Sequence, residues 1–512
     1  MKKALLIIVD GLGEGADYPG NAVTRAELMT LPELKKTAPW TLLQASGEAV
    51  GVPEETMGGS EVGHFTMGAG RIVFQTLETI NKLIKNREFF YDETLIKACT
   101  QVKRTPGAAL HLLGMISDQG IHAHIAHLFA LLEITKEQDV PEVIIHAITD
   151  GRDVPESSAK KYIKQIEDKI EELGLQKIAR IGSVIGRYYA MDRDSNWDRL
   201  QKAYDLYTEG EGQQVETGAE AIDKGYEMGA ETDYYIRPVV VGSARPIRSE
   251  DAVIFFNFRT DRARQLTWAF TGEHDELIRL TQPVGERPRP FFVCFGDYSK
   301  QAPVLFPTPI IRNNLGTVIA EHGLRQFRLA ETEKYAHVTY FFNSQVETPL
   351  PKEDRLMIDS PKCPSYAQKP EMSAAEITDT LLTKLNDDYA LIVVNFANCD
   401  LVGHSGDLPA ALKAMQVVDS CLGRILPAAE KAGYTTLITG DHGNIESMLY
   451  ENGSAKPSHT RNPVPFIIAG ATDKNLKLRT DGGLQDVAPT ILDIMGVTKP
   501  AEMSGNSLIV AE

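Results

Sequence analysis

Short apolar runs rich in β-branched residues recur along the chain, and each one ends in a polar turn. Runs that are apolar at every position are typical of buried strands, and strands that alternate with helices build a parallel sheet. We expect strands near residues 4–9, 108–117, 143–148, 178–184, 253–256, 391–396, 434–439 and 465–469. We expect helices near residues 77–90, 123–137, 157–173, 373–386 and 408–432. This alternation predicts an α/β fold.

Acidic residues and histidines follow three of the expected strands directly. Asp10 follows the first strand, Asp400 and His404 follow the strand at 391–396, and the pair Asp441-His442 follows the strand at 434–439. Ligands bind at the carboxyl ends of strands in open α/β sheets. Carboxylate and imidazole together suit Zn²⁺ or Mn²⁺, although any one of these residues could instead cap a helix or complete a turn.

The composition fits a folded protein of more than one domain. The chain has 512 residues, of which 43% are hydrophobic and 24% charged, close to globular averages. Its net charge of −17 argues against nucleic-acid and membrane partners, but not against a local basic pocket for an anionic metabolite. The five cysteines are scattered, and no apolar stretch is as long as a transmembrane helix. The apolar start lacks a cleavage pattern, so we expect a cytoplasmic protein with reduced thiols.

A glycine-rich stretch at residues 51–71 surrounds Ser60. Glycines beside the serine allow a tight turn that exposes its hydroxyl, and a helix starting here would offer free N–H groups to an anion. A serine nucleophile also needs a base or a metal to lower its pKa. The structural alternative is an ordinary helix N-cap. His64, four residues later, could support such a site or belong to the core.

Arginines cluster after the expected strand at 253–256, where three fall within six residues, including Arg259 and Arg262. They could lie on a solvated helix face, or they could be held at a strand end to bind an anion. A strand and two aromatic residues precede them, which favours anion binding, because guanidinium groups pair well with carboxylate and phosphate. Similar polar clusters follow other strands of this middle region, at 150–153 and 186–194.

The candidate metal ligands form a set large enough for two ions. They are Asp10, Ser60, Asp400, His404, Asp441, His442 and His459. Two metals that share one hydroxyl nucleophile can hold the oxygens of an in-line phosphoryl displacement. The mixed donors make Mn²⁺ the expected metal.

A series of ordered motifs makes the chain recognisable over essentially its whole length. They lie at residues 9–11, 59–64, 150–153, 186–194, 257–262, 330–337, 395–404, 441–444 and 459–465. In these motifs the sequence resembles the cofactor-independent phosphoglycerate mutases, within the alkaline phosphatase superfamily. The family usually has Asn at the position of Gly59, Gly at that of Gln119 and Pro at that of Cys399. None of these departures removes a proposed ligand or arginine.

The resemblance implies a fold, a reaction and a place for it. It implies two α/β domains, with a phosphatase-like domain at 1–76 plus 309–512 split by an inserted transferase domain at 77–308. It implies interconversion of 3-phosphoglycerate and 2-phosphoglycerate in glycolysis and gluconeogenesis, through a phosphoserine and without 2,3-bisphosphoglycerate. The inserted domain would act as a lid that keeps water out. We expect a monomer whose only partner is this small-molecule substrate.

The resemblance also implies a role for each matched residue. Asp400, His404 and His459 would bind one metal ion. Asp10, Ser60, Asp441 and His442 would bind the other, with Ser60 as the nucleophile. The expected substrate-binding residues are His122, Arg152, Asp153, Arg187, Arg193, Arg259, Arg262 and Lys334. Asp153 would act as the acid/base on the substrate hydroxyls, with His122 beside it.

Two other functions fit parts of the sequence. A metal-dependent phosphatase or sulfatase, or a pentose-phosphate mutase, would need the metal ligands but not this set of arginines. A regulatory protein that has lost activity would be expected to lack Ser60 or a ligand, and here none is missing.

Overall fold

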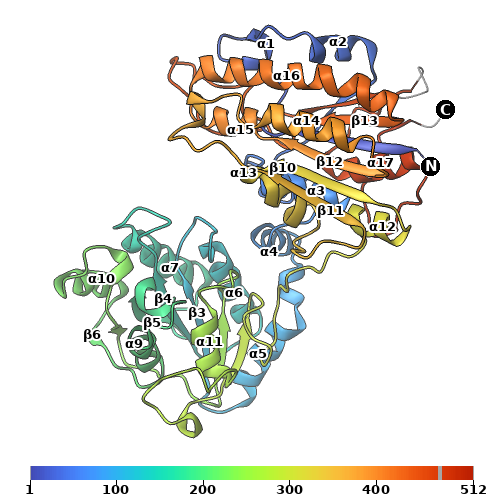
Figure 1. Ribbon diagram of the computed structural model, residues 1–512. Coiled ribbons are helices and arrows are strands. Elements are labelled where there is room, and N and C mark those ends of the chain that lie inside the picture. Colours follow the sequence, from blue (N-terminus) through green and yellow to red (C-terminus); the bar gives the residue numbers. More distant parts are fainter. Residues whose placement is uncertain (1, 471–475, 511–512) are drawn as a thin grey trace. The chain divides into compact units, whose positions relative to one another are not determined.

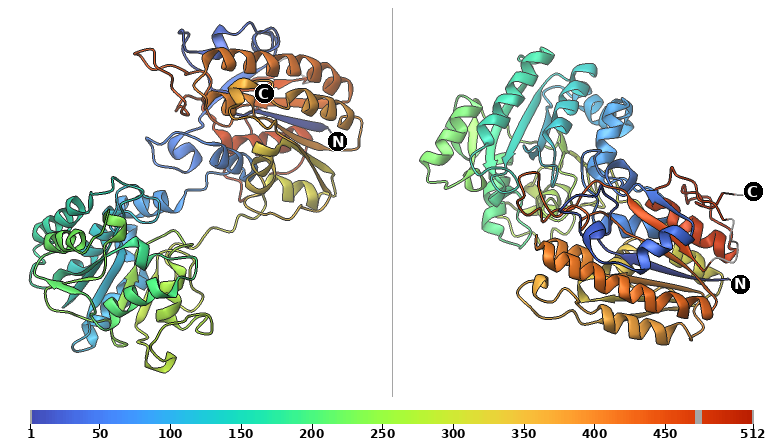
Figure 2. Two further views of the ribbon diagram at one scale, coloured as in Figure 1. Left: turned by 60° about the vertical axis from the view of Figure 1, so that its left-hand side comes forward. Right: turned by 90° about the horizontal axis from the view of Figure 1, so that it is seen from above.

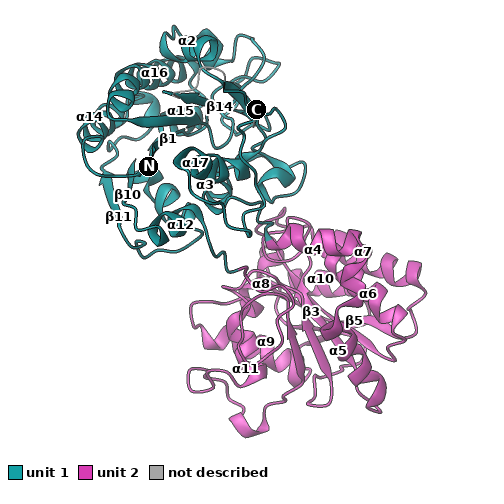
Figure 3. Ribbon diagram, turned by 90° about the vertical axis from the view of Figure 1, so that its right-hand side faces the viewer, with its two compact units in different colours: residues 1–75, 310–512 teal, residues 76–309 magenta. Residues whose placement is uncertain are grey.

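The computed structural model describes residues 2–470 and 476–510, which fall into two compact units. Unit 1 comprises Met1–Gln75 and Ile310–Glu512, and unit 2 comprises Thr76–Pro309 (Figure 3). The chain therefore starts and ends in unit 1, and unit 2 is inserted into it. Within the described residues no helix combines the length and the apolarity needed to cross a membrane.

Unit 1 is built on a seven-stranded sheet with the order β11-β10-β12-β1-β13-β14-β2. Its strands are β1 (Lys3–Val9), β2 (Trp40–Leu43), β10 (Gln326–Glu331), β11 (Glu353–Ile358), β12 (Leu391–Phe396), β13 (Tyr434–Thr439) and β14 (Val464–Ala469). The central strand β1 pairs in parallel with both β12 and β13. The β14 and β2 strands join in antiparallel orientation. As a result, the carboxyl ends of β1, β12 and β13 meet at one edge of the sheet.

Helices cover both faces of this sheet (Figure 1). They are α1 (Ala22–Arg25), α2 (Thr30–Thr37), α3 (Ser60–Ala69), α12 (Leu315–Glu321), α13 (Thr332–Ala336), α14 (Ala374–Lys384), α15 (Asn398–Gly403), α16 (Leu408–Lys431) and α17 (Val487–Met495). Leu5 and Ile7 of β1 belong to the core formed with α14 and α16. Leu6 and Ile8 belong to the core formed with α3, α12 and α17. Burial on both faces explains why β1 is apolar at successive positions.

Unit 2 contains a second seven-stranded sheet, with the order β6-β7-β5-β4-β3-β8-β9. Its strands are β3 (Leu110–Met115), β4 (Val143–Thr149), β5 (Ala179–Gly186), β6 (Gln213–Val215), β7 (Val239–Val241), β8 (Ala252–Phe255) and β9 (Phe291–Cys294). Its helices are α4 (Thr76–Lys85), α5 (Glu93–Arg104), α6 (Ile125–Glu137), α7 (Ala159–Leu173), α8 (Arg187–Ala190), α9 (Trp197–Thr208), α10 (Gly218–Glu227) and α11 (Arg264–Thr271). Figure 2 shows the same layering of each unit from two further directions.

The α/β fold class is confirmed, with two local corrections. Neither sheet is purely parallel, because β14 runs antiparallel to β13 and β2 in unit 1, and β7 runs antiparallel to β5 in unit 2. The helix expected at 77–90 stops at Lys85, and a short 3-10 turn, Glu88–Tyr91, follows. The break occurs where Arg87 takes a positive φ of 67°, a left-handed conformation that a helix cannot continue through.

Candidate active site

The three strand ends of unit 1 bring buried acids and histidines together. Asp10 follows β1, Asp400 lies in α15 just after β12, and Asp441 and His442 follow β13. Side-chain donor atoms of Asp400, His442 and His459 all lie within 4.8 Å of one another. This spacing allows the three groups to bind one metal ion.

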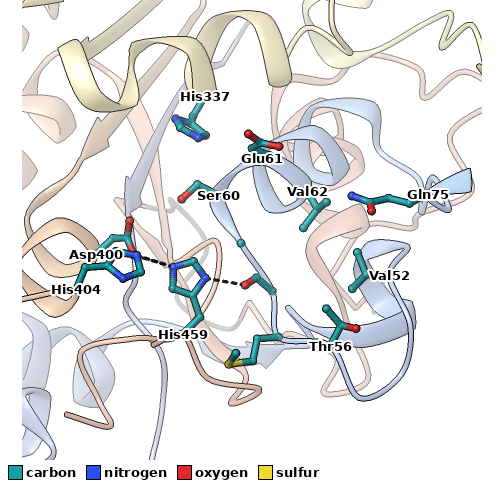
Figure 4. A pocket seen from close by; sticks show the side chains of 13 residues that line it. Val52, Thr56, Ser60, Glu61, Val62, Gln75, His337, Asp400, His404 and His459 are labelled. Atoms are coloured by element: carbon teal, nitrogen blue, oxygen red, sulfur yellow. Dashed lines mark hydrogen bonds and ion pairs between the residues drawn. The ribbon is translucent and has the colours of Figure 1, made fainter. Parts of the chain in front are cut away.

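Asp400, His404 and His459 form the first part of the site, next to Ser60 (Figure 4). Oδ1 of Asp400 lies 3.2 Å from Nε2 of His404 and 3.1 Å from Nε2 of His459. The two Nε2 atoms lie only 2.9 Å apart. Each Nδ1 faces a backbone carbonyl, that of Pro457 for His404 and that of Gly58 for His459.

The tautomers of these two histidines follow from those carbonyl contacts. A carbonyl oxygen only accepts, so in a neutral ring Nδ1 carries the proton and Nε2 keeps its lone pair. Two lone pairs and a carboxylate oxygen then point at one place. Histidine ligands that donate their other N–H to a carbonyl are typical of zinc-like metal sites, so this donor set fits a divalent cation.

Asp10, Ser60, Asp441 and His442 form the second part of the site. Oγ of Ser60 donates to Oδ1 of Asp10 at 3.1 Å and lies 3.0 Å from Nε2 of His442. Nε2 of His442 lies 3.5 Å from Asp10 and 3.6 Å from Asp441. Burial alone would lower the pKa of His442. The carboxylates of Asp441 and Asp10 have the larger combined effect and raise this pKa to about 10. The surroundings thus favour positive charge at this point.

Lys334 supplies a cation among these acids. Its Nζ lies 2.6 Å from Asp10, 2.6 Å from Oγ of Ser60 and 2.7 Å from Asp400. Burial lowers the pKa of Lys334, but Asp10 and Asp400 more than compensate and raise it above its usual value. One ammonium faces three buried carboxylates, since Asp441 is also fully buried. The excess negative charge is a second reason why the site fits metal cations.

His64 and Asn395 contact two of the site's carboxylates, those of Asp10 and Asp441, and hold them in place. Nδ2 of Asn395 donates to Oδ2 of Asp10 at 2.8 Å and to Nε2 of His64 at 3.0 Å. The proton of a neutral His64 therefore lies on Nδ1, which faces the Ser60 carbonyl at 2.8 Å and Oδ2 of Asp441 at 3.2 Å. His64 lies within metal-binding distance of Asp10 and Asp441. With both nitrogens engaged, however, it orients Asp441 and has no lone pair for a metal.

Ser60 is the first residue of α3, and close backbone contacts place it there. A Cβ added at Gly63 would lie 2.6 Å from the Asp441 carbonyl oxygen, so only glycine lets the helix lie this close to the Asp441 loop. Ser60, Asp400, His404 and His459 line a cavity of about 450 Å³ (Figure 4). The serine is thus held beside the donor set and next to open volume.

A second group of the expected residues gathers in unit 2 around Arg187. Nη1 of Arg187 donates to Asp150 and to Asp153, each at 2.6 Å, and Nη2 lies 2.8 Å from Nε2 of His122. Guanidinium nitrogens only donate, so His122 accepts at Nε2 and carries its proton on Nδ1. That Nδ1 is buried and has no hydrogen-bond partner in the described part of the chain. Burial is the main reason that the pKa of His122 is lowered to about 4, and the positive charge of Arg187 contributes to the decrease.

Three of the other expected arginines, Arg193, Arg259 and Arg262, lie in the segments that follow β5 and β8. Asp261 accepts from Nη1 of Arg193 at 2.8 Å and from Nε of Arg259 at 3.0 Å. Nη1 of Arg262 donates to the Met191 carbonyl at 3.1 Å. Burial, Arg193 and Arg187 lower the pKa of Arg262, as expected for neighbouring guanidinium groups. Arg152 is exposed on the loop after β4.

The expected site residues therefore form two groups, one in each unit. All the expected metal ligands and Lys334 lie in unit 1, whereas His122, Asp153 and the arginines lie in unit 2. Lys334 is expected among the substrate-binding residues, and in the structure its ammonium contacts the acids around Ser60. Asn395 and Asp261 are site residues that the sequence did not predict. Their only sequence signal is their position in or just after a strand that carries other site residues.

Comparisons with known proteins show what the whole chain is similar to. The Metalloenzyme superfamily model matches residues 2–499. Proteins of Desulforudis audaxviator and Moorella thermoacetica, both named 2,3-bisphosphoglycerate-independent phosphoglycerate mutase, are each 48% identical, over 99% of this chain and 98% of their own. The structure of Leishmania mexicana phosphoglycerate mutase at low cobalt concentration covers 100% of this chain and 98% of its own, with 29% identity and a TM-score of 0.60. The metal-binding donor set and the full-length similarity lead to one conclusion: the chain belongs to the 2,3-bisphosphoglycerate-independent phosphoglycerate mutases.

Proposed function

We infer that this protein interconverts 3-phosphoglycerate and 2-phosphoglycerate, as a glycolytic and gluconeogenic enzyme that needs no 2,3-bisphosphoglycerate, and that Ser60 carries the phosphoryl group in between. One observation supports the serine route above all. Oγ of Ser60 lies beside Lys334, Asp10 and His442, at 2.6, 3.1 and 3.0 Å. A hydroxyl with an ammonium on one side and metal-type donors on the other is placed to act as a nucleophile.

We assign two divalent ions to the donor set of unit 1, with Mn²⁺ as the preferred metal. Asp400, His404 and His459 would hold one, and Asp10, Ser60, Asp441 and His442 would hold the other. When bound, such metals lower the pKa of a hydroxyl nucleophile and offset negative charge on a phosphoryl group. The support is the pair of facing Nε2 atoms and the excess of buried carboxylates over cations.

The chain's own residues act on the phosphoryl group at Ser60. The ammonium of Lys334 lies against Oγ and would stabilise the negative charge that this oxygen carries once it has lost its proton, before it attacks phosphorus. No side chain at the N-cap, Gly59, bonds to the first N–H groups of α3, so the start of this helix would bind an anion at the same place. The phosphoserine formed on Ser60 then keeps the phosphoryl group while the glycerate turns.

The unit 2 group serves the glycerate part of the substrate in this proposal. The guanidinium groups of Arg152, Arg193 and Arg259 are exposed, and those of Arg193 and Arg259 bond to Asp261 through one nitrogen each. Their other N–H groups would pair with carboxylate and phosphate oxygens of the substrate. Asp153 would move the proton of each substrate hydroxyl as acid and base. Neutral His122, with an unpartnered Nδ1–H, would donate a hydrogen bond to the bound ligand. Retention of glycerate until the second transfer is what separates a mutase from a phosphatase.

The decisive experiment follows the two products of purified protein given 3-phosphoglycerate and no bisphosphoglycerate. We expect 2-phosphoglycerate with little free phosphate, and a phosphorylated peptide containing Ser60 after acid quenching. Ser60→Ala should lose the activity while keeping the fold and the metal, and exposed Ser454→Ala is the matched control. Retention of a tenth of the wild-type rate by Ser60→Ala, about 1.4 kcal/mol in barrier, would rule out the phosphoserine route.

A further inference from the structure

Glu446 is a buried carboxylate that lies outside the metal donor set. Its side chain is 1% exposed. Oε2 accepts from the backbone N–H of Asn444 at 2.8 Å and from that of Gly13 at 3.2 Å. Oε1 accepts from Nδ2 of Asn462 at 2.9 Å and from the hydroxyl of Thr460. Four neutral donors thus satisfy one buried negative charge, which is a strong set of charge-assisted hydrogen bonds.

These four donors come from the three loops that carry the proposed ligands. Gly13 lies three residues after Asp10, and Thr460 follows His459 directly. Asn444 belongs to the turn of Asp441 and His442, and its Nδ2 also donates to Oδ1 of Asp400 at 3.0 Å. The Thr460 N–H donates to the Gly443 carbonyl at 2.9 Å, which joins two of the loops directly. Glu446 is therefore the point where the β1, β13 and His459 loops are held together.

The loops fit closely around this side chain. A Cβ added at Gly13 would lie 2.4 Å from the carboxyl carbon of Glu446, and one added at Gly443 would lie 2.4 Å from its Oε1. Neither position has room for a larger residue while Glu446 stays in place. The carboxylate thus occupies a fitted space between the loops, and removing it would leave four donors without an acceptor.

We propose that Glu446 is a positioning residue for the metal site: it sets the spacing between Asp10, the Asp441-His442 pair and His459. The inference rests on the metal ligands assigned above. Metal affinity depends on holding the ligands at the right distances before the ion arrives, and partners outside the ligand shell typically change affinity or activity 10- to 100-fold. Loss of Glu446 should therefore weaken the binding of both ions, since Glu446 holds loops that carry ligands of both.

Two substitutions separate the effect of the four hydrogen bonds of Glu446 from the effect of its negative charge. Glu446→Ala removes all four contacts. In Glu446→Gln the amide oxygen can face the two backbone N–H groups, which cannot turn around. Its amide nitrogen then faces Thr460 and Asn462, whose side chains can rotate to accept. We expect Glu446→Ala to raise the dissociation constant for Mn²⁺ at least about tenfold and Glu446→Gln to raise it less. Exposed Glu430→Ala, on α16 of the same unit, should leave it unchanged.

The test is a titration of the full-length, metal-stripped protein with Mn²⁺. The electron paramagnetic resonance signal of the free ion measures how much Mn²⁺ remains unbound at each step. Thermal melting in EDTA shows whether each variant is folded before metal is added. Weakened Mn²⁺ binding by folded variants, with kcat reduced and KM for 3-phosphoglycerate little changed, supports the positioning role.

Wild-type affinity in both folded variants would overturn it. If Glu446→Ala does not fold, Glu446→Gln and Thr460→Val decide, and wild-type affinity in both would equally overturn it. A wild-type protein that binds no Mn²⁺ contradicts the metal assignment itself, so the two failures are distinct.

Discussion

Oγ of Ser60 and Nζ of Lys334 lie 2.6 Å apart although 274 residues separate them in the sequence. The same ammonium contacts Asp10 and Asp400. Lys334 thus performs two tasks at once: it supports the nucleophile, and it is the internal cation of an acidic, buried cluster.

Replacement of Lys334 by Met should therefore show whether metal ions can substitute for the ammonium in neutralising the buried carboxylates. Removing one partner of a buried ion pair costs about 3–5 kcal/mol, because the remaining charges stay buried. We expect Lys334→Met to lose activity and to be destabilised strongly in EDTA, and less in Mn²⁺, which supplies positive charge. Urea unfolding in the two buffers measures this, with exposed Lys413→Met as the control. Equal destabilisation in both buffers would show that no metal shares these carboxylates.

Removal of metal should abolish activity and lower the melting temperature, and Mn²⁺ should restore both. The reason is the pair of Nε2 atoms of His404 and His459, which need a cation between them. Histidine binds metal only when deprotonated, so acid should release the ion and activity should rise from acidic to neutral or alkaline pH. Full activity after exhaustive chelation, with no metal by elemental analysis, would contradict this.

His122 should make unit 2 less stable in mild acid. The pKa of His122 in the folded protein is lowered to about 4, whereas its pKa in the unfolded chain is about 6.5. Unfolding therefore binds a proton between these values, so this contribution to the free energy of unfolding falls as pH drops from about 6.5 to about 4. His122→Gln should make the pH slope of urea unfolding shallower in that window, by about one proton. An unchanged slope would mean that His122 titrates normally.

Arg262→Ala should separate mutase from phosphatase behaviour. Arg262 belongs to the unit 2 group proposed to retain glycerate, not to the group around Ser60. We expect most mutase flux to be lost while the phosphoserine still forms, so that free phosphate per mutase turnover rises. The two products are followed together in variant and wild type. If both fall in strict proportion, Arg262 only helps the substrate to bind.

Gly63→Ala should destabilise unit 1 and displace Ser60. The new methyl group would lie 2.6 Å from the Asp441 carbonyl oxygen, and overpacking of this kind costs about 1–3 kcal/mol. Gly285 has no atom within 4 Å of an added Cβ, so Gly285→Ala is a matched control. Urea unfolding gives the energies. A Gly63→Ala protein as stable as the control would show that α3 and the Asp441 loop move apart easily.

The sequence predicted best the elements whose side chains all face the core. The strands expected at 391–396 and 434–439 have the same bounds in the structure, because burial on both faces favours apolar and β-branched side chains at nearly every position. The edge strands β2 and β6 were missed, since they are short and partly exposed and follow no strict pattern. The residues that follow the central strands were found because parallel strands share one edge.

The partners of those residues could not be found in the same way. Glu446 bonds to Gly13 across 433 positions, and Asn395 bonds to Asp10 across 385. No periodicity or spacing encodes a contact between loops so far apart. Asp261 lies among the arginines it orients, yet its sequence neighbourhood does not distinguish a pairing acid from a solvated one.

The pairing of β1 has a consequence for how the chain is made. Its neighbours β12 and β13 begin only at Leu391 and Tyr434, so the first strand to leave the ribosome waits for most of the chain before either partner exists. By then the inserted unit, which ends at Pro309, has been synthesised in full. Domains fold as they are completed, and contacts of such long sequence separation form slowly. Unit 2 therefore has time to fold first, while unit 1 is the last to assemble and the more exposed to misfolding during synthesis.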